Sequence, residues 1–256
     1  MKFKIAYCTD IGRTKKVNQD SIGYREIEIG ENKYILMMVC DGMGGLQKGE
    51  MASTTVVRNF LDWFVLKFPL FCDDFNYAKI QTETENEIVR LNLALHDFGE
   101  ERGIQLGTTL SMIIMRDDGL YFISSVGDSR MYGIYADSAV QITEDQTYIA
   151  QEIKHNRMTK EEAAASKYKN VLTQCIGVSS DVEPLFYRGK ANAGDMFLSC
   201  SDGFRHFLSE EDIYKSFSEI RNGNEEDWTK SLRKITDFNM EQGENDNITS
   251  VVVKIE

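Results

Sequence analysis

The stretch YILMMVCDGMGGLQKGEMA, residues 34–52, places an apolar run directly before Asp41 and a glycine-rich segment directly after it. The apolar run is typical of a buried β-strand, and the residues after Gly49 have the composition of a helix start. A glycine-rich corner between a strand and a helix has three interpretations. It is a phosphate-binding loop, a corner at which Asp41 holds a metal ion, or a plain tight turn.

Hydrophobic spacing on either side of this stretch predicts blocks of strands separated by helices. Strands are expected at 2–8, 21–30, 32–40, 107–115, 119–127, 130–136, 139–143, 195–201 and 248–255. Helices are expected at 47–68, 76–102, within 145–170, from residue 209 and at 225–243. The four consecutive strands between 107 and 143 are interpreted as one antiparallel meander. This order predicts an α+β protein, a four-layer α-β-β-α sandwich in which two mainly antiparallel sheets are flanked by paired helices.

Size and charge limit the possible functions. The chain has 256 residues, which suits one domain, and 41 acidic against 29 basic side chains give a formal net charge of −12. This balance argues against nucleic acid and anionic membranes as partners, because both need clustered lysine and arginine. No run approaches a signal peptide or the roughly 20 apolar residues of a membrane span. The five cysteines form no CxxC pair, so a cytoplasmic location is expected.

Four aspartates lie at predicted strand ends. Asp41, Asp128 and Asp202 each follow a strand, and Asp246 precedes one. An aspartate after one strand and an aspartate before its antiparallel neighbour can project from the same sheet edge. Converging carboxylates repel one another unless a cation lies among them, and all-oxygen sites suit magnesium and manganese. A single such aspartate is more often a turn cap, but four at strand ends favour a metal site.

Several other catalytic motifs are absent from the sequence. Gly44 and Gly49 have the spacing of a phosphate loop, but Glu50 stands where that loop needs lysine. No cysteine is followed by an arginine six residues later, and no G-x-S-x-G motif occurs. The three histidines form no HExxH pair, and each is interpreted as a surface or packing residue. The phosphate-loop interpretation of the opening stretch is therefore excluded.

Eight motifs in order resemble one family over essentially the whole chain. They are TDIGRTKKVNQD (9–20), VCDGMGGLQKGEMAS (39–53), GTTL (107–110), VGDSRMY (126–132), ITEDQT (142–147), LTQCIG (172–177), LSCSDGF (198–204) and ENDNITSVVV (244–253). The set resembles the metal-dependent serine/threonine protein phosphatases of the protein phosphatase 2C type, in their compact bacterial form. The DGMGG motif alone is weak, whereas eight blocks in order are very specific.

The resemblance implies a central β-sandwich with a dinuclear metal site at one sheet edge. Asp41, Asp202 and Asp246 would be the catalytic carboxylates. Asp41 would bridge both ions, the Gly42 carbonyl would ligate one of them, and Asp202 and Asp246 would complete the other. Two ions close together lower the pKa of a bridging water, and the resulting hydroxide would attack phosphorus in line without a covalent phosphoenzyme.

The resemblance also implies supporting parts around the two Mn²⁺ or Mg²⁺ ions. Asp20 would support the site through ordered water, and Asp128 would join Asp202 at a third, weaker ion. Residues from about 145 to 190 would form a flap subdomain beside the cleft within the single domain 1–256.

The chain departs from the family at two positions near the substrate. Lys15 aligns with an arginine that usually grips the substrate phosphate, and lysine lacks the planar fork of a guanidinium. Arg13 lies two residues earlier and would face the same side if this segment were a strand, so Lys15 and Arg13 are both candidate phosphate-binding residues. Met43 stands where animal members carry a histidine proposed as the general acid, so the identity of the acid stays open.

The expected function is hydrolysis of phosphoserine and phosphothreonine in proteins by a cytoplasmic monomer. A serine/threonine kinase of the same cell is the expected partner, by family analogy alone. Two alternatives remain open: a non-catalytic phosphoprotein-binding relative, for which Lys15 argues slightly, and a hydrolase of small phosphoesters. Intact Asp41, Asp202 and Asp246 argue against the first alternative.

Overall fold

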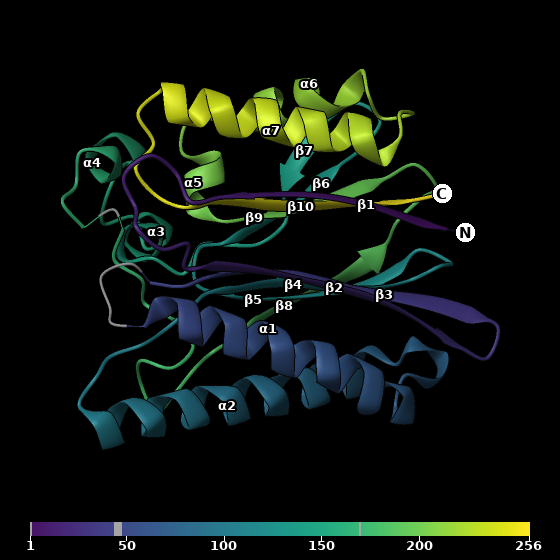
Figure 1. Cartoon of the computed structure of the whole chain (residues 1–256), viewed down its shortest axis with the longest axis horizontal. Coiled ribbons are helices and arrows are strands. Elements are labelled where there is room, and N and C mark those ends of the chain that lie inside the picture. The colour runs from purple at the N-terminus through teal and green to yellow at the C-terminus, as the bar shows by residue number, and fades with distance from the viewer. Residues whose placement is uncertain (1, 44–47, 169) are drawn as a thin grey trace.

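The structure is a computed structural model that describes residues 2–43, 48–168 and 170–256. Four layers are stacked in it: a helical layer, two β-sheets face to face and a second helical layer (Figure 1). One sheet has the order β1 (Phe3–Asp10), β10 (Ile248–Ile255), β9 (Met196–Cys200), β6 (Arg130–Ile134) and β7 (Ala139–Gln141). The other has the order β2 (Asp20–Ile29), β3 (Asn32–Asp41), β4 (Leu110–Arg116), β5 (Leu120–Val126) and β8 (Leu185–Lys190). All strand pairs are antiparallel, and the predicted α-β-β-α sandwich is confirmed.

The outer layers are the helix pairs expected from the sequence. Helices α1 (Gly49–Leu66) and α2 (Tyr77–Arg102) cover the β2–β8 sheet, and α6 (Glu210–Ser218) and α7 (Glu225–Glu241) cover the other sheet. Asn76 caps the start of α2 by accepting a hydrogen bond from the Lys79 amide, and Gly103 ends it in a left-handed conformation. Short elements complete the chain: α3 (Tyr148–Lys154), α4 (Lys160–Ala164), α5 (Asp202–Arg205) and two 3₁₀ turns, Phe68–Leu70 and Asp73–Phe75. No helix in the described parts of the chain is long and apolar enough to cross a membrane.

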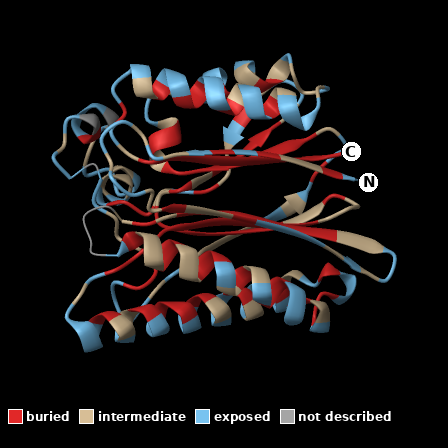
Figure 2. Ribbon diagram, viewed as in Figure 1, coloured by how far each residue is buried: buried red, intermediate tan, exposed pale blue. Residues whose placement is uncertain are grey.

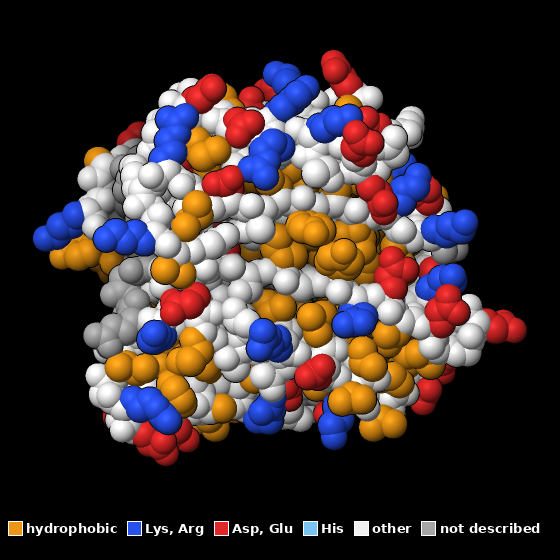
Figure 3. All heavy atoms as spheres, in the orientation of Figure 1, with side chains coloured by type: hydrophobic (Ala, Val, Ile, Leu, Met, Phe, Trp, Pro, Cys, Tyr) orange, Lys and Arg blue, Asp and Glu red, His pale blue; other side chains and the backbone are white. Residues whose placement is uncertain are grey.

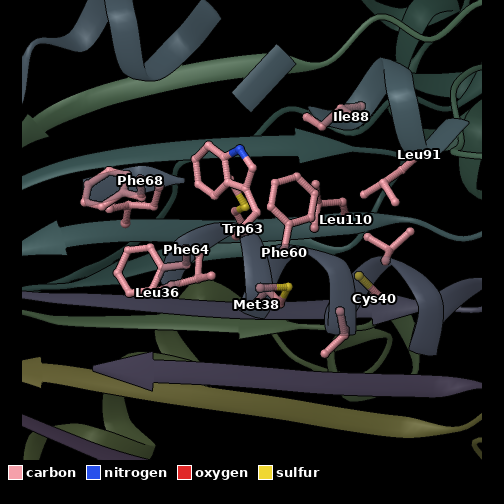
Figure 4. Close-up of a cluster of buried hydrophobic side chains, with 14 of the residues drawn as sticks. Leu36, Met38, Cys40, Phe60, Trp63, Phe64, Phe68, Ile88, Leu91 and Leu110 are labelled. Atoms are coloured by element: carbon pink, nitrogen blue, oxygen red, sulfur yellow. The ribbon is translucent and has the colours of Figure 1, made fainter. Parts of the chain in front are cut away.

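Three apolar layers hold the sandwich together, one between the sheets and one beneath each helix pair (Figure 2). The layer under α1 and α2 is rich in aromatic rings (Figure 4). Phe60, Trp63 and Phe68 come from α1 and the turn after it, and they pack on Leu36 and Met38 of β3. Because both faces of β3 are covered, its side chains read as a continuous apolar run rather than an alternating one.

One prediction about the strands is wrong, and one strand was not predicted. The four strands between 107 and 143 do not form one meander, because the chain leaves one sheet after β5 and enters the other at β6. Gly127, with φ of 94°, turns the chain at this crossing. The strand β8 was not predicted, so the expected flap boundary near 190 includes a strand that pairs with β5.

The open edges β1 and β2 of the two sheets lie on one face of the molecule, where hydrophobic side chains gather (Figure 3). Tyr7 of β1 and Tyr24 of β2 are both nearly half exposed, and their ring centroids lie 5.9 Å apart across the gap between the two edge strands. Glu225 of α7 accepts a hydrogen bond of 3.0 Å from the Ile5 amide, an edge group that another strand could otherwise pair with.

Candidate active site

A cleft of about 500 Å³ opens at the end of the sandwich where β3 and β9 finish. The carboxyl groups of four aspartates line it, together with Lys15 and Met43. These aspartates are Asp41, Asp128, Asp202 and Asp246. The predicted convergence of strand-end aspartates is therefore present in the structure. Both sheets contribute, since Asp41 ends a strand of one sheet, whereas Asp202 and Asp246 adjoin strands of the other.

The register of the β2–β3 hairpin places Asp20 directly opposite Asp41. Residues paired in this way project to the same face, and two like charges there are destabilising without a counter-charge. The backbone of Asp41 is fixed on its other side, because its amide donates to the Thr109 hydroxyl and its carbonyl accepts from the Thr108 hydroxyl, both at 2.9 Å. The hairpin and the segment just before β4 thus hold the backbone of Asp41 in place.

Gly42 is the point at which the chain turns out of β3, and no side chain fits there. A Cβ at Gly42 would lie 2.4 Å from the Gly49 carbonyl oxygen and 2.5 Å from that of Gln19. The Gly42 amide donates to the Gln19 carbonyl at 3.1 Å. The glycine therefore serves close packing of three backbone segments beside Asp41. Gly44, Gly45 and the rest of 44–47 lie outside the described residues.

Asp202 and Asp246 are connected through the side chains of His206 and Glu244. The Nε2 atom of His206 lies 3.4 Å from Asp202 Oδ2, and its Nδ1 atom lies 2.7 Å from Glu244 Oε2. Glu244 Oε1 in turn accepts from the Asp246 amide at 2.9 Å. Burial alone would lower the pKa of His206, but its hydrogen bonds to Asp202 and Glu244 raise it to about 9. His206 is exposed, as the sequence interpretation had it, but that interpretation missed its contacts with Asp202 and Glu244.

Gly203 allows two backbone segments of the site to pack closely. A Cβ there would lie 2.3 Å from the carbonyl oxygen of Asn247 and 3.5 Å from the Asp246 Cβ. Helix α5, which starts at Asp202, therefore packs directly on the loop that carries Asp246.

The cluster carries more negative charge than its surroundings compensate. Both carboxyl oxygens of Asp20 and Oδ1 of Asp202 are buried without a hydrogen-bond partner. Burial, reinforced by the charges of Asp202 and Asp246, raises the pKa of Asp20 to about 7, and the nearby Thr249 and Ser201 hydroxyls oppose this only in part.

The neighbouring carboxyl groups have shifted pKa values too. Burial and the charges of Asp20 and Asp202 raise the pKa of Asp41 well above its ordinary value. Burial also acts to raise the pKa of Asp202, but the hydrogen bond from His206 and the charge of Arg205 outweigh it, and the pKa is lowered.

This donor set fits divalent cations. Orphaned buried carboxylate oxygens and mutual repulsion are what a bound cation would relieve. No group of three histidine, cysteine, aspartate or glutamate side chains in 2–43, 48–168 and 170–256 is arranged around one point. Magnesium and manganese commonly keep several bound waters, so each ion would need few side-chain ligands.

Lys15 lies in the cleft on the loop between β1 and β2. Its Nζ atom is 2.6 Å from Asp246 Oδ1. Burial alone would lower the pKa of Lys15, but the hydrogen bond to Asp246 and the charges of Asp41 and Asp202 raise it. The Thr14 hydroxyl donates to the Asn245 carbonyl at 2.7 Å, so the Lys15 loop is tied to the Asp246 loop.

Arg13 does not share this position. Residues 11–19 form a loop rather than a strand, so the alternation argument that placed Arg13 beside Lys15 is wrong. Arg13 is exposed and is not among the residues that line the cleft.

The segment expected as the flap supplies the far wall of the cleft. Asn170, Val171, Leu172, Cys175 and Val178 line it there. Paired backbone hydrogen bonds between Thr108 and Ile176, of 3.0 and 2.9 Å, attach this wall to the segment that follows α2. The wall is thus fastened close to Asp41, and its motion as a flap stays a prediction.

Asp128 lies beside Arg205, which sequence reasoning missed. The Arg205 Nη2 atom is 3.3 Å from Asp128 Oδ2 and 3.1 Å from the Asp128 carbonyl oxygen. Burial and the charge of Asp202 raise the pKa of Asp128 to about 6, although Arg205 lowers it in part. One signal in the sequence was available: Arg205 and His206 stand three and four residues after Asp202, the spacing at which helical side chains meet.

Comparison with known proteins agrees with this geometry. The family model described as "Protein phosphatase 2C" matches residues 11–243. The chain belongs to the protein phosphatase 2C family. It is 31% identical over 248 residues to the serine/threonine phosphatase stp of Listeria innocua, covering 96% of this chain and 93% of that protein.

Solved structures show the same similarity. The Streptococcus agalactiae serine/threonine phosphatase superposes with a TM-score of 0.87 at 28% identity over 100% of both chains. The catalytic domain of the phosphatase PstP, solved with two manganese ions, superposes with a TM-score of 0.74 at 26% identity over 98% of this chain and 97% of that one. The expected enzyme class, a serine/threonine protein phosphatase, is confirmed.

Proposed function

We propose that this phosphatase hydrolyses phosphoserine and phosphothreonine in proteins at the cleft between Asp41, Asp202 and Asp246, with two divalent ions held there. The observation that carries the proposal is the convergence of these carboxylates with buried, unpartnered oxygens of Asp20 and Asp202. The manganese ions of the related PstP structure support it.

Asp41, Asp202 and Asp246 would hold the ions, with the Gly42 carbonyl as a further donor and Asp20 acting through water. Mn²⁺ and Mg²⁺ are the proposed ions, because all these donors are hard oxygen atoms. When bound, the ions would supply positive charge to the phosphoryl oxygens and an activated water for attack on phosphorus.

The remaining residues contact the substrate phosphate or position the metal-binding carboxylates. Lys15 is the proposed phosphate contact, because its ammonium group reaches into the cleft on a loop tied to the Asp246 loop. It would supply a point charge without the bidentate geometry of arginine. Glu244 and His206 hold Asp246 and Asp202 in a fixed relation to each other, so their role is positioning.

The test is phosphate release from a phosphothreonine peptide by the wild type, with Mn²⁺ and with chelator, and by Asp246→Asn. Asp118→Asn is a matched control, because Asp118 lies in the β4–β5 turn at the other end of the sheet and pairs with Arg116. Turnover that needs Mn²⁺, collapses in Asp246→Asn and survives in Asp118→Asn is expected. A folded wild type with bound Mn²⁺ and no turnover would favour the phosphoprotein-binding alternative, and turnover of small esters alone would favour the other.

The cellular compartment and the opposing enzyme are also proposals. The substrates would be phosphoproteins of the cytoplasm, and a serine/threonine kinase would be the opposing enzyme. All five cysteines are free and buried, which suits a reducing compartment. Size-exclusion chromatography with light scattering would test the expected monomer.

A further inference from the structure

A second hollow of about 620 Å³ shares Lys15, Asp128 and Asp246 with the cleft and carries a further set of charges. Arg130 forms two hydrogen bonds with Asp145, of 2.8 and 2.6 Å, in the paired geometry that arginine favours. Its Nη1 atom also donates to the Tyr132 hydroxyl at 2.9 Å. Asp145 is therefore fixed in place by Arg130, and its Oδ2 atom lies 3.7 Å from Arg205.

Arg205 occupies the space between Asp145 and Asp128. Its side chain is 11% exposed and that of Asp128 is 13% exposed. The guanidinium group donates to both the carboxylate and the backbone carbonyl of Asp128. An ion pair so little exposed to water is costly to separate, because neither charge recovers full solvation when its partner leaves.

Arg205 and the next residue, His206, both lie near Asp202. Arg205 follows Asp202 on α5, a helix that lies at the same end of the molecule as α3 and α4 (Figure 1). His206 is hydrogen-bonded to Glu244, and its Nε2 atom lies 3.4 Å from Asp202 Oδ2. An ion shared by Asp128 and Asp202 would thus adjoin the Arg205 guanidinium, whose permanent positive charge would repel it.

We propose that Arg205 takes the place of a third ion in this protein, so that the chain binds two divalent ions and Asp128 ligates neither. This inference rests on the proposed metal site and departs from the expectation of a third, weaker ion at Asp128 and Asp202. The guanidinium group supplies a permanent positive charge beside Asp202 that does not depend on the metal concentration.

The test counts bound Mn²⁺ by equilibrium dialysis with elemental analysis, and by the loss of the electron paramagnetic resonance signal of free Mn²⁺. The wild type is expected to hold two ions at saturation, and Asp128→Asn is expected to hold the same two. Arg205→Gln is expected to gain a third ion with affinity at least about tenfold above any further binding by the wild type. The third ion should disappear again in the Arg205→Gln, Asp128→Asn double variant.

Two further variants serve as controls. Arg205→Lys keeps a positive charge and should hold two ions. Arg221→Gln removes an equally buried arginine that pairs with Asp195 at the opposite end of β9, and it should also hold two.

Three results would overturn the inference. One is a wild type that binds three ions and loses the third in Asp128→Asn, a measurement that does not depend on the folding of an Arg205 variant. Another is a folded Arg205→Gln protein that still binds two. A wild type that binds no Mn²⁺ would overturn both this inference and the proposed metal site, whereas the first two results leave the proposed function intact.

Discussion

Replacing Asp20 by asparagine is expected to stabilise the metal-free protein at alkaline pH while weakening its metal site. Asp20 is 8% exposed, both of its carboxyl oxygens lack a hydrogen-bond partner, and it faces Asp41 across the hairpin. An ionised carboxylate in this position destabilises the folded protein and so lowers the free energy of unfolding. Asparagine has nearly the same shape and cannot ionise.

The size of the effect follows from the pKa of Asp20, which burial raises from 3.8 to about 7. Between these values the folded protein retains a proton that the unfolded chain has lost, so the free energy of unfolding falls as the pH rises. Above about pH 7 the full penalty is present, up to about 4 kcal/mol, because each tenfold change in proton affinity is worth about 1.4 kcal/mol. The buried amide of asparagine costs about 1–2 kcal/mol, which leaves a net gain of about 2–3 kcal/mol for Asp20→Asn.

Urea unfolding followed by tryptophan fluorescence, in chelator, measures this gain at several values between about pH 5 and about pH 8. The two proteins should differ little near pH 5, and Asp20→Asn should become the more stable as the pH rises. Asp118→Asn is the control with the opposite sign, since its hydrogen bond with Arg116 lowers the pKa of Asp118. A folded Asp20→Asn protein that is no more stable than the wild type near pH 8 would refute the reasoning.

Three other expectations follow from the same site. Mn²⁺ at about one hundred times its dissociation constant should stabilise the wild type by about 2.7 kcal/mol; calorimetry should show a higher Tm that chelator reverses, and an unchanged Tm would contradict binding to the folded state. Lys15→Met should raise KM for a phosphopeptide. It should also tighten Mn²⁺ binding about two- to fivefold, because the ammonium no longer pairs with the half-buried Asp246. Lys15→Arg should restore KM, whereas an unchanged KM in Lys15→Met would show that Lys15 does not contact the substrate. The pKa of His206 is raised to about 9, so its stabilising contribution should be complete below about pH 6.5 and lost as the pH rises through about 9. In chelator, the difference in unfolding free energy between wild type and His206→Gln should therefore disappear over that range. A constant difference would show that the contacts with Asp202 and Glu244 do not depend on the charge of the imidazole.

The sequence predicts the layers of this fold because local patterns define them. The strand β3 and the final strand are continuous runs rich in apolar residues, the α2 helix has apolar residues at helical spacing, and the hairpin turn and helix caps mark their ends. The assignment of β5 and β6 to different sheets could not be predicted in this way. Apolar spacing shows that a segment is a strand, but it does not specify which sheet receives the strand. The edge strand β8 has only partly buried and exposed residues, so it lacks the signal of a buried strand.

The same contrast holds at the site. Asp202 and Asp246 could be predicted to meet because the antiparallel neighbours β9 and β10 share one edge, and a strand end is visible in the sequence. Asp41 joins them from the other sheet, and strand ends alone do not specify how two sheets face each other. Arg205 and His206 could not be assigned in the same way. Their roles arise where α5 approaches the β5–β6 crossing and the Glu244 loop, and these contacts join segments 38–77 residues apart.

The placement of the site between the two sheets explains why its charges are balanced by mobile as well as fixed cations. Asp20 and Asp41 belong to one sheet, and Asp202 and Asp246 adjoin strands of the other, so their repulsion acts to separate the sheets at this end. Further along, the sheets are held by apolar packing and by the Ser199 hydroxyl, which donates to the Ser111 carbonyl at 3.1 Å. Arg205 neutralises part of the cluster at any pH, and His206 does so below about pH 9. The unpartnered oxygens of Asp20 and Asp202 are left for exchangeable ions. A bound ion would therefore join the two sheets as well as serve catalysis, and loss of metal should loosen this end of the sandwich before the other.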